Sequence, residues 1–288
     1  MGVKRMRTNK KDKIYIFRIF RTILGPIYKW YYNPKIIGKE NIPKDGSMLV
    51  VGNHIHIMDQ CNVIISTKRP IHYMAKKEYF DPQYKEGKFG WFFRSAGCIP
   101  VDRQIHDDAA KGAALDVLND GHALGLFPEG TRNGLKEAKA KEVYDKYVDS
   151  NEISFEDFYK NAKKIRTSQV NYLEELLDKK IIKKKDIKEN INRVDDYLQE
   201  LVKSKKIKQK DYDEHFLLPF KFGAVSMAQK TDSYLLPFGI SGDYKFRSKN
   251  LVIRIGKPFK VSKDDDLAEV NKKLYNEIYS LIKGNNEK

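Results

Sequence analysis

The sequence predicts an α/β fold, a central mixed sheet flanked by helices, and three observations support this prediction. Short apolar runs alternate with stretches of helical character from Pro34 onward. Six of these runs have the length and composition of strands: 48–52, 71–75, 97–101, 122–127, 234–240 and 251–256. The chain has 288 residues, of which 41% are hydrophobic, so it can bury a sizeable core.

Three parts are expected along the chain: a basic N-terminal segment (1–33), an α/β domain in two pieces (34–133 and 216–288), and a charged helical insertion (134–215). The α/β domain ends in a helix that we expect to start near Ser262 and to bury one face. That face consists of Leu267, Val270, Leu274, Ile278 and Leu281. The two cysteines, Cys61 and Cys98, form no metal-binding pair and predict free thiols in a reducing compartment.

The N-terminal segment has the pattern of a membrane-seated amphipathic helix. Its apolar residues recur at helical spacing, at Ile16, Phe20, Ile23 and Ile27, and we expect Gly25-Pro26 to stop or kink the helix. An aromatic cluster follows, and the first 40 residues hold 11 Lys or Arg against two acidic residues. No uninterrupted apolar stretch has the length of a transmembrane helix, and the charged residues in the N-terminal apolar stretch lead us to expect no secretion signal. We therefore expect the protein at the cytoplasmic face of the cell membrane, peripheral or monotopic, on an anionic surface.

The insertion lacks strand-like runs and proline, so helices are expected throughout it. Its 20 basic and 18 acidic residues nearly balance, which indicates a solvated helical surface and argues against nucleic-acid binding. One apolar stripe runs through Ile187, Ile191, Val194, Leu198 and Leu201. A weak repeat recurs three times, with Ile153, Ile182 and Ile207 each followed four residues later by Asp. Three roles stay open for the insertion: a lid, an arm for a partner or for self-association, and a surface elaboration.

Common catalytic motifs are absent, namely the serine-hydrolase elbow, the zincin helix and the dinucleotide fingerprint. The glycines of 125–130 have P-loop spacing, but Thr131 stands where a P-loop requires lysine. What stands out is His54, which follows an apolar strand, with Asp59 five residues later. An imidazole accepts a hydroxyl proton best when a carboxylate fixes its tautomer, so this pair is a candidate general base. No metal site is indicated.

Two further strands end in groups suited to an anionic ligand. Glu129, Gly130, Thr131 and Arg132 follow one of them, where a turn can present backbone N–H groups and a guanidinium to a phosphate. Arg103 follows the other. The carboxyl ends of strands in an open α/β sheet line a ligand crevice, so we expect these groups to meet His54 there.

Together these residues resemble the 1-acyl-sn-glycerol-3-phosphate acyltransferase (lysophosphatidic acid acyltransferase) family. The resemblance covers residues 30–133 and 217–260 and rests on blocks in family order. The blocks are Asn53-His54 through Asp59, Ala75 through Glu78, Gly97 through Arg103, Phe127 through Arg132, Phe220 through Ala224 and Leu236 through Gly239. This sequence departs from the family pattern in Ile55-His56-Ile57 and in the long insertion after Arg132.

The resemblance implies acyl transfer from a thioester to the free hydroxyl of lysophosphatidic acid, which gives phosphatidic acid for phospholipid synthesis. It implies His54 as base and Asp59 as its partner. The substrate-binding residues would be Lys76, Arg103, Glu129, Gly130, Thr131 and Arg132. No cofactor is implied beyond the thioester co-substrate, either acyl-CoA or acyl carrier protein. Two alternatives stay open, namely the same chemistry on glycerol 3-phosphate or another lysolipid, and a non-catalytic basic adaptor at a membrane surface.

Overall fold

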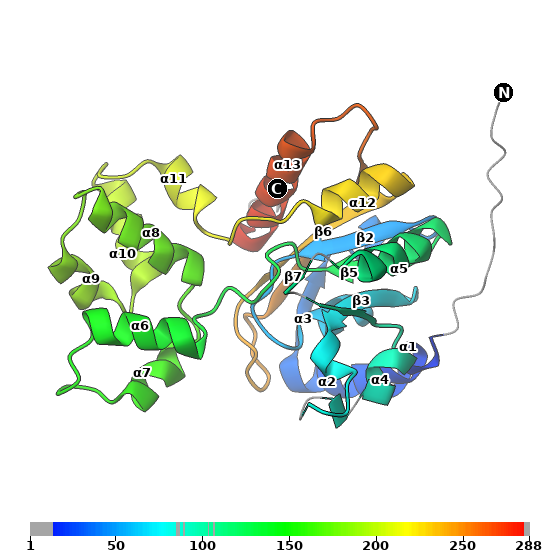
Figure 1. Ribbon diagram of the computed structural model, residues 1–288, viewed down its shortest axis with the longest axis horizontal. Helices are drawn as coiled ribbons and strands as arrows, with labels where there is room; N and C mark the ends of the chain where they lie inside the picture. The colour runs from blue at the N-terminus through cyan, green and yellow to red at the C-terminus, as the bar shows by residue number, and fades with distance from the viewer. Residues whose placement is uncertain (1–13, 85–86, 89, 103, 106, 285–288) are drawn as a thin grey trace. The chain divides into compact units, whose positions relative to one another are not determined.

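The computed structural model describes residues 14–84, 87–88, 90–102, 104–105 and 107–284. The chain divides into two compact units (Figure 1). The sheet unit comprises Met1–Gly130 and Phe220–Lys288, and the helical unit comprises Thr131–Pro219. The basic residues expected to precede the N-terminal helix, 1–13, lie outside the described part.

The sheet unit is built on eight strands in the order β1-β7-β6-β2-β5-β3-β4, with β8 also paired to β6. Strands β2, β3, β4, β5 and β6 are parallel, whereas β6 runs antiparallel to β7 and β8. The sheet is mixed, which confirms the predicted fold class. The strands are β1 (Lys35–Ile37), β2 (Met48–Gly52), β3 (Ile71–Lys76), β4 (Ile99–Val101), β5 (Ala123–Leu126), β6 (Tyr234–Ser241), β7 (Val252–Ile255) and β8 (Phe259–Lys260).

All six predicted strands form, and the two that sequence reasoning missed, β1 and β8, have three and two residues. Helices flank the sheet as expected. On one side α5, α12 and α13 pack against β2, β5 and β6, and on the other lie α1, α2, α3 and α4 (Figure 1). These helices are α1 (Tyr15–Ile19), α2 (Gly25–Tyr32), α3 (Asp59–Ile64), α4 (Gly90–Ser95), α5 (Asp108–Asn119), α12 (Gly223–Thr231) and α13 (Leu267–Lys283). Short 3-10 turns span Lys39–Asn41 and Lys77–Tyr79.

The core of the sheet unit follows from strands that are apolar on both faces. Every residue of β2 is buried, as expected for a strand with parallel neighbours and helices on either side. Met48 and Val50 of β2 share one cluster with Ile14 and Phe17 at the N-terminal helix. Alternate residues of each strand point to opposite faces, so the remaining β2 side chains pack on the other side.

The N-terminal segment is helical throughout 15–32, so of the two outcomes expected at Gly25-Pro26, a stop or a kink, the stop does not occur. A π-helical turn, Phe20–Leu24, joins α1 to α2, and Pro26 lies in the first turn of α2, where a missing N–H costs little. The helix ends at Asn33, which takes a left-handed conformation. No helix in the described part of the chain is both long and apolar enough to cross a membrane.

The C-terminal helix α13 begins at Leu267, five residues later than expected near Ser262. Asp266 is its N-cap, and its carboxylate accepts hydrogen bonds from the amides of Ala268 and Glu269. Three of the five predicted core positions, Leu274, Ile278 and Leu281, are buried, whereas Leu267 and Val270 are only half-buried. The helix packs against β6.

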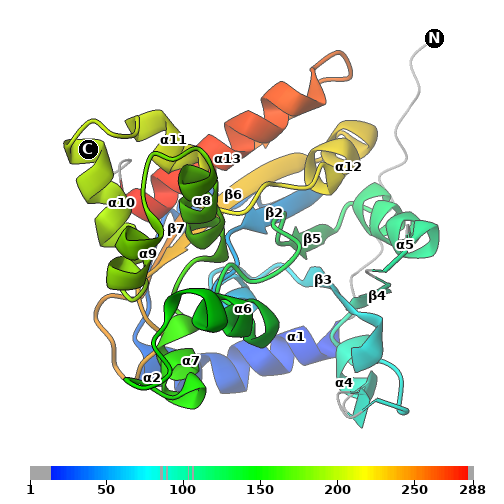
Figure 2. The same cartoon turned by 60° about the vertical axis from the view of Figure 1, so that its left-hand side comes forward.

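The helical unit consists of three successive helix pairs, and α8, α9 and α10 are visible side by side in Figure 2. Its helices are α6 (Glu137–Tyr147), α7 (Phe155–Ala162), α8 (Thr167–Asp178), α9 (Lys184–Asn190), α10 (Val194–Lys203) and α11 (Gln209–Glu214). The predicted sequence repeat corresponds to the same structure in the two later pairs, α8–α9 and α10–α11. In each pair a lysine, Lys180 or Lys205, takes a left-handed conformation after the first helix, two residues before a buried isoleucine. The predicted stripe is buried, but it is divided between α9 and α10.

Candidate active site

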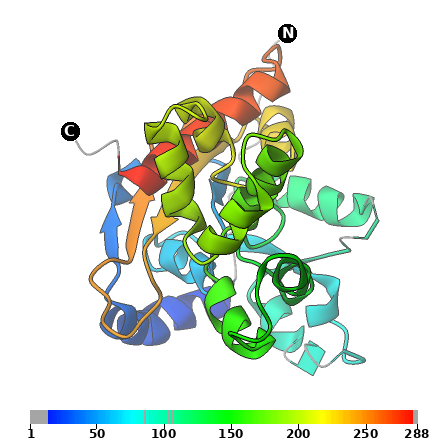
Figure 3. The same cartoon turned by 90° about the vertical axis from the view of Figure 1, so that its left-hand side faces the viewer.

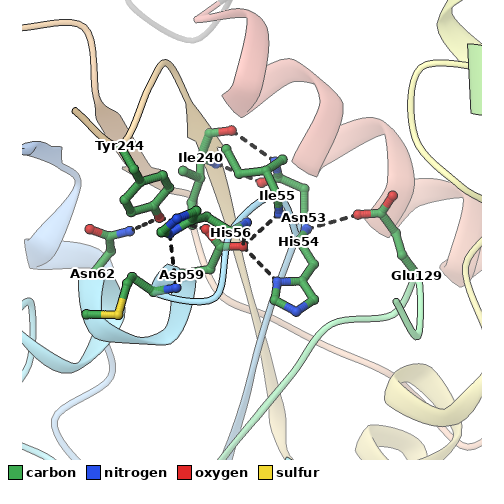
Figure 4. Close-up of polar contacts among 10 residues, drawn as sticks. Asn53, His54, Ile55, His56, Asp59, Asn62, Glu129, Ile240 and Tyr244 are labelled. Atoms are coloured by element: carbon green, nitrogen blue, oxygen red, sulfur yellow. Dashed lines mark hydrogen bonds and ion pairs between the residues drawn. The ribbon is translucent and has the colours of Figure 1, made fainter. Parts of the chain in front are cut away.

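The candidate site is built around a hydrogen-bonded histidine and aspartate at the carboxyl end of β2. His54 lies in the loop after β2, and Asp59 is the first residue of α3. The Nδ1 atom of His54 lies 2.7 Å from a carboxylate oxygen of Asp59 (Figure 4). A spacing of five residues brings the two together because the loop reverses before the helix starts. Since Nδ1 faces the carboxylate, Nε2 is the ring atom left for a ligand.

Asp59 is fully buried, and hydrogen bonds from several donors compensate for burying its charge. Its Oδ2 oxygen accepts from the backbone amides of Ile55 and His56, at 2.7 and 2.8 Å, as well as facing the imidazole. Its Oδ1 oxygen accepts from the hydroxyl of Tyr244 at 2.6 Å. The carboxylate therefore organises the whole turn that carries His54.

Two neighbouring strands hold the histidine from either side. The Asn53 side chain is buried and exchanges two hydrogen bonds with the backbone of Ile240 in β6, at 2.7 and 2.9 Å. The His54 ring stacks on Phe127, which follows β5, with ring centroids 4.0 Å apart. Gly52, the last residue of β2, fits against the ring of Phe238, and a Cβ there would lie within 2.4 Å of that ring. The imidazole is consequently fixed by packing as well as by Asp59.

Glu129 and Gly130 lie beside His54 because β2 and β5 are adjacent, parallel and in register. The backbone N–H of His54 donates to the Glu129 carboxylate at 3.0 Å, and Glu129 is buried. Gly130 has a φ of +69°, which favours glycine, and a Cβ there would lie 2.9 Å from the Lys221 side chain. The structure thus brings a lysine to this turn that sequence reasoning had not assigned to the site.

Lys221 is placed by two features of the chain. Its backbone N–H donates to the carbonyl of Pro128 at 2.9 Å, and it stands two residues before α12. The signal available in the sequence was the block Phe220 through Ala224, which we had matched to the family without assigning Lys221 a role. An ammonium group beside Gly130 gives this turn a positive charge.

Among the described residues, the other predicted substrate-binding residues are not brought to the His54 loop by contacts of the kind that Glu129 makes. Lys76 ends β3 and is exposed, with no side-chain hydrogen bond or ion pair found for it among the described residues. Its neighbour Lys77 pairs instead with Asp102 at 2.6 Å, and this hydrogen bond raises the pKa of Lys77 and lowers the pKa of Asp102. Arg103 lies outside the described residues. Thr131 and Arg132 are the first residues of the helical unit. They follow Gly130 directly in the chain, and Arg132 is exposed.

Tyr244 and Asn62 are further site residues that the sequence analysis missed. Tyr244 stacks on His56, with ring centroids 4.1 Å apart, in addition to its hydrogen bond to Asp59. The amide of Asn62 donates to the Tyr244 hydroxyl at 2.5 Å. His56, an extra imidazole of unassigned role, is thus a packing partner of Tyr244. Tyr244 comes from a loop nearly 200 residues away and carries no motif, so the sequence offered no signal for it.

Within the described part of the chain, no group of three or more His, Cys, Asp or Glu side chains is arranged to hold a metal ion. Cys61 is buried in α3, and burial raises the pKa of its thiol to about 12. Cys98 is also a free thiol, whose pKa burial raises to about 11.

Comparison with known proteins gives the family. The model of the acyltransferase family matches residues 33–241. The chain belongs to this acyltransferase family. A Bacillus subtilis protein named 1-acyl-sn-glycerol-3-phosphate acyltransferase is 31% identical over 99 residues, which cover 34% of this chain and 48% of that protein. A Borreliella burgdorferi protein of the same name is 34% identical over 108 residues, which cover 36% of this chain and 42% of that protein.

This chain also resembles a solved structure. The crystal structure of the 1-acyl-sn-glycerophosphate (LPA) acyltransferase PlsC from Thermotoga maritima matches with a TM-score of 0.54 and 16% identity. The match covers 98% of this chain and 85% of that one, and it establishes a shared fold. The chain matches less than half the length of both curated relatives, and these comparisons confirm the family resemblance expected from the sequence.

Proposed function

We propose that this acyltransferase moves a fatty acyl group from a thioester to the free hydroxyl of lysophosphatidic acid, giving phosphatidic acid for phospholipid synthesis. The observation that carries the proposal is the His54–Asp59 pair at the carboxyl end of β2, with the 2.7 Å contact at Nδ1 that leaves Nε2 as the base. The names of the two relatives support the acceptor.

The reaction proceeds by direct transfer. Nε2 of His54 takes the proton of the acceptor hydroxyl as its oxygen attacks the thioester carbonyl. The carboxylate of Asp59 stabilises the imidazolium that results. Collapse of the tetrahedral intermediate breaks the carbon–sulfur bond, and the departing thiolate takes the proton back from the imidazolium. Ester and thiol are the products, and the imidazole is regenerated. The thioester donor is acyl-CoA or an acyl group carried by acyl carrier protein.

The phosphate of the acceptor is bound by positive groups around the turn after β5. Lys221 beside Gly130 is one such group, and Arg132, two residues further along the chain, is the second. The family resemblance implies Lys76 and Arg103 as further phosphate-binding residues beside Arg132, and Glu129 with the backbone of Gly130 and Thr131 shapes the acceptor site. A dianionic phosphate is recognised best by charged donors of this kind.

We also propose that helix 15–32 seats the enzyme on the cytoplasmic face of an anionic membrane. One side of it packs on the sheet unit through Phe17 and Tyr28, while the other carries large exposed apolar side chains. These are Ile19, Ile23, Leu24, Ile27, Trp30 and Tyr31. Arg18 and Lys29 are exposed on the same helix and suit anionic headgroups. Of the predicted stripe, Ile16 and Phe20 are half-buried, and Ile23 and Ile27 are exposed.

Purified full-length protein, labelled acyl-CoA and a panel of acceptors test the acyl transfer. We expect labelled phosphatidic acid, and His54→Ala lowers turnover by about 10²- to 10⁴-fold at little cost in thermal stability. His122→Ala, at the turn before β5, is the matched control. Preference for glycerol 3-phosphate or a lysolipid without phosphate would identify the alternative acceptor. Unchanged turnover in His54→Ala, or no thioester consumption with any acceptor, would contradict the proposal and favour the adaptor.

Co-sedimentation with vesicles containing anionic lipid tests the membrane seat. Replacing Ile23 and Ile27 together by Asp should weaken binding at least about tenfold, because two exposed apolar side chains no longer enter the interface. Ile181→Asp, at an exposed isoleucine of the helical unit, is the control. Equal binding of the double variant and the wild type would refute this location.

A further inference from the structure

The two oxygens of the Asp59 carboxylate have different partners. Oδ2 serves the imidazole of His54 and two backbone amides, whereas the Tyr244 hydroxyl is the one partner found for Oδ1 among the described residues. Asp59 is 0% exposed, so Oδ1 has no access to bulk water that could replace this donor. The Tyr244 hydroxyl therefore fixes how the carboxylate is rotated, and with it the direction in which Oδ2 meets the imidazole.

Tyr244 is in turn held by a hydrogen-bond chain that ends on helix α2. Its hydroxyl proton goes to Asp59, so the hydroxyl oxygen accepts from the side-chain amide of Asn62 at 2.5 Å. The carbonyl oxygen of that amide accepts from the Tyr28 hydroxyl at 2.8 Å. Tyr244 and Asn62 each donate one hydrogen bond and accept another in this chain, and these roles fix the orientation of the buried Asn62 amide.

The loop that carries Tyr244, between β6 and β7, is attached to α2 at further points (Figure 3, orange loop beside the blue helix). Its Phe246 ring contacts Trp30 and Tyr31, with centroids 5.6 and 5.1 Å apart. The backbone N–H of Arg247 donates to the carbonyl of Tyr31 at 2.6 Å. The helix that we place at the membrane surface thus also sets the position of the loop.

We propose that Tyr244 is a positioning residue for the Asp59–His54 pair, and that helix α2 holds it in place through Asn62 and Tyr28. This proposal rests on the proposed acyl transfer for its kinetic readout. The Tyr244 hydroxyl acts through Asp59 and takes no part in the bond changes. The motif blocks around His54, Glu129 and Gly97 do not predict a positioning residue at Tyr244.

The charges around the pair make a pH profile informative. Burial, followed by the nearby Asp59 charge, raises the pKa of Tyr244, and burial also raises that of Tyr28, so both stay protonated donors. Glu129 contacts the His54 backbone, and His56 stacks on Tyr244. Cys61 and Tyr73 are further titratable groups near Asp59, and burial raises the pKa of both above its ordinary value, so they stay protonated at neutral pH. Removing the Tyr244 hydroxyl takes one hydrogen bond away from the Asp59 carboxylate, which then attracts the imidazolium more strongly.

Tyr244→Phe tests the proposal, because it deletes the hydroxyl and keeps the ring that stacks on His56. We expect kcat to fall about tenfold while the KM for the acceptor stays within about twofold. The acidic limb of the kcat/KM profile should move up by about 0.5 pH unit. The matched control is Tyr32→Phe, which lies in the same aromatic cluster and has no hydrogen-bond partner found for its hydroxyl among the described residues. Wild-type kcat and pH profile in Tyr244→Phe would overturn the proposal.

A second variant and a second measurement separate this proposal from the acyl transfer itself. Tyr28→Phe removes only the far end of the chain, so we expect a smaller fall, about two- to threefold, if α2 holds Tyr244. In protein labelled with ¹⁵N-histidine, the Nδ1 proton signal of His54 should move in Tyr244→Phe and stay in place in Tyr32→Phe. This signal needs no activity. An unmoved signal refutes the positioning role, whereas a moved signal in a protein without acyl transfer refutes only the proposed function.

Discussion

The sheet unit and the helical unit both bury polar side chains, but these side chains have different partners. In the sheet unit, one group of buried polar side chains, Asn53, Asp59, Asn62 and Glu129, holds the His54 loop or a group that touches it. The other buried polar side chains of this unit, Thr67, Thr231, Ser233 and Asn271, bond elsewhere. In the helical unit, the buried polar residues are Asn133, Ser168 and Gln169.

The buried polar groups of the helical unit join segments of the chain to one another. The Asn133 amide donates to the Ser168 hydroxyl and to the carbonyl of Phe216, while its oxygen accepts from the amide of Ser168. These bonds connect the first and last residues of the unit. The buried groups around the His54 loop differ in that they converge on an exposed titratable side chain, the imidazole that is 20% exposed, which is the arrangement expected of a reactive site.

Asp59→Ala gives the largest expected effect and tests the sheet-unit half of this comparison. Turnover should fall by about 10²- to 10⁴-fold, because the imidazole loses the group that orients it. Stability should also fall by about 1–3 kcal/mol, since the Tyr244 hydroxyl and two backbone amides lose their acceptor. Steady-state kinetics and thermal denaturation measure both effects.

The control for that experiment is Asp45→Ala, at an exposed turn where no partner was found among the described residues. His54→Ala gives a useful contrast, because it should remove activity at little cost in stability. If Asp59→Ala kept wild-type turnover, the buried polar cluster of the sheet unit would have only a structural role, as in the helical unit.

Asn133→Ala gives the next largest effect and tests the helical-unit half. Loss of the side chain leaves the backbone N–H of Ser168 without its acceptor and removes the hydrogen bond that the Asn133 amide donates to the Ser168 hydroxyl. These losses should lower the free energy of unfolding by about 1–3 kcal/mol. Hydrogen exchange at the start of α8 reads this directly, because the Ser168 amide donates to Asn133 at 3.1 Å. Asn151→Ala, at an exposed asparagine, is the control. Unaltered exchange at Ser168 would show that the two ends of the unit are joined by packing alone.

The sequence predicted those parts of the molecule that depend on local patterns. Short apolar runs predict strands such as β2 and β5. A histidine placed after a strand, with an aspartate five residues later, predicts the His54–Asp59 pair. Tyr244 and Lys221 could not be predicted as site residues, because their positions depend on strand order. Tyr244 reaches Asp59 only through the pairing of β6 with β2 and β7, and no residue spacing encodes that pairing.

Boundaries were predicted less well than elements, for a related reason. Ser262 and Asp266 are both acceptable helix caps by composition, and the choice between them depends on where the chain leaves β8 and meets the sheet. At Gly25-Pro26 the local rule predicts a stop or a kink, and the stop does not occur because Pro26 falls in the first turn of α2, where the helix tolerates proline. In both cases tertiary context selected one of two locally permitted outcomes.

Ser154→Ala gives the smallest effect and sharpens the comparison within the helical unit. The Ser154 hydroxyl accepts from the amide of Asp157 and caps α7, whereas lysines occupy the N-cap positions of α9 and α11. Loss of this cap should cost about 1 kcal/mol and increase hydrogen exchange in the first turn of α7, while Ser154→Asn keeps an acceptor there and stays near wild type. Turnover should be unchanged, because the cap is a local contact of the helical unit. A drop in turnover would instead mean that the stability of α7 affects the rate of acyl transfer, and that the helical unit contributes to the activity.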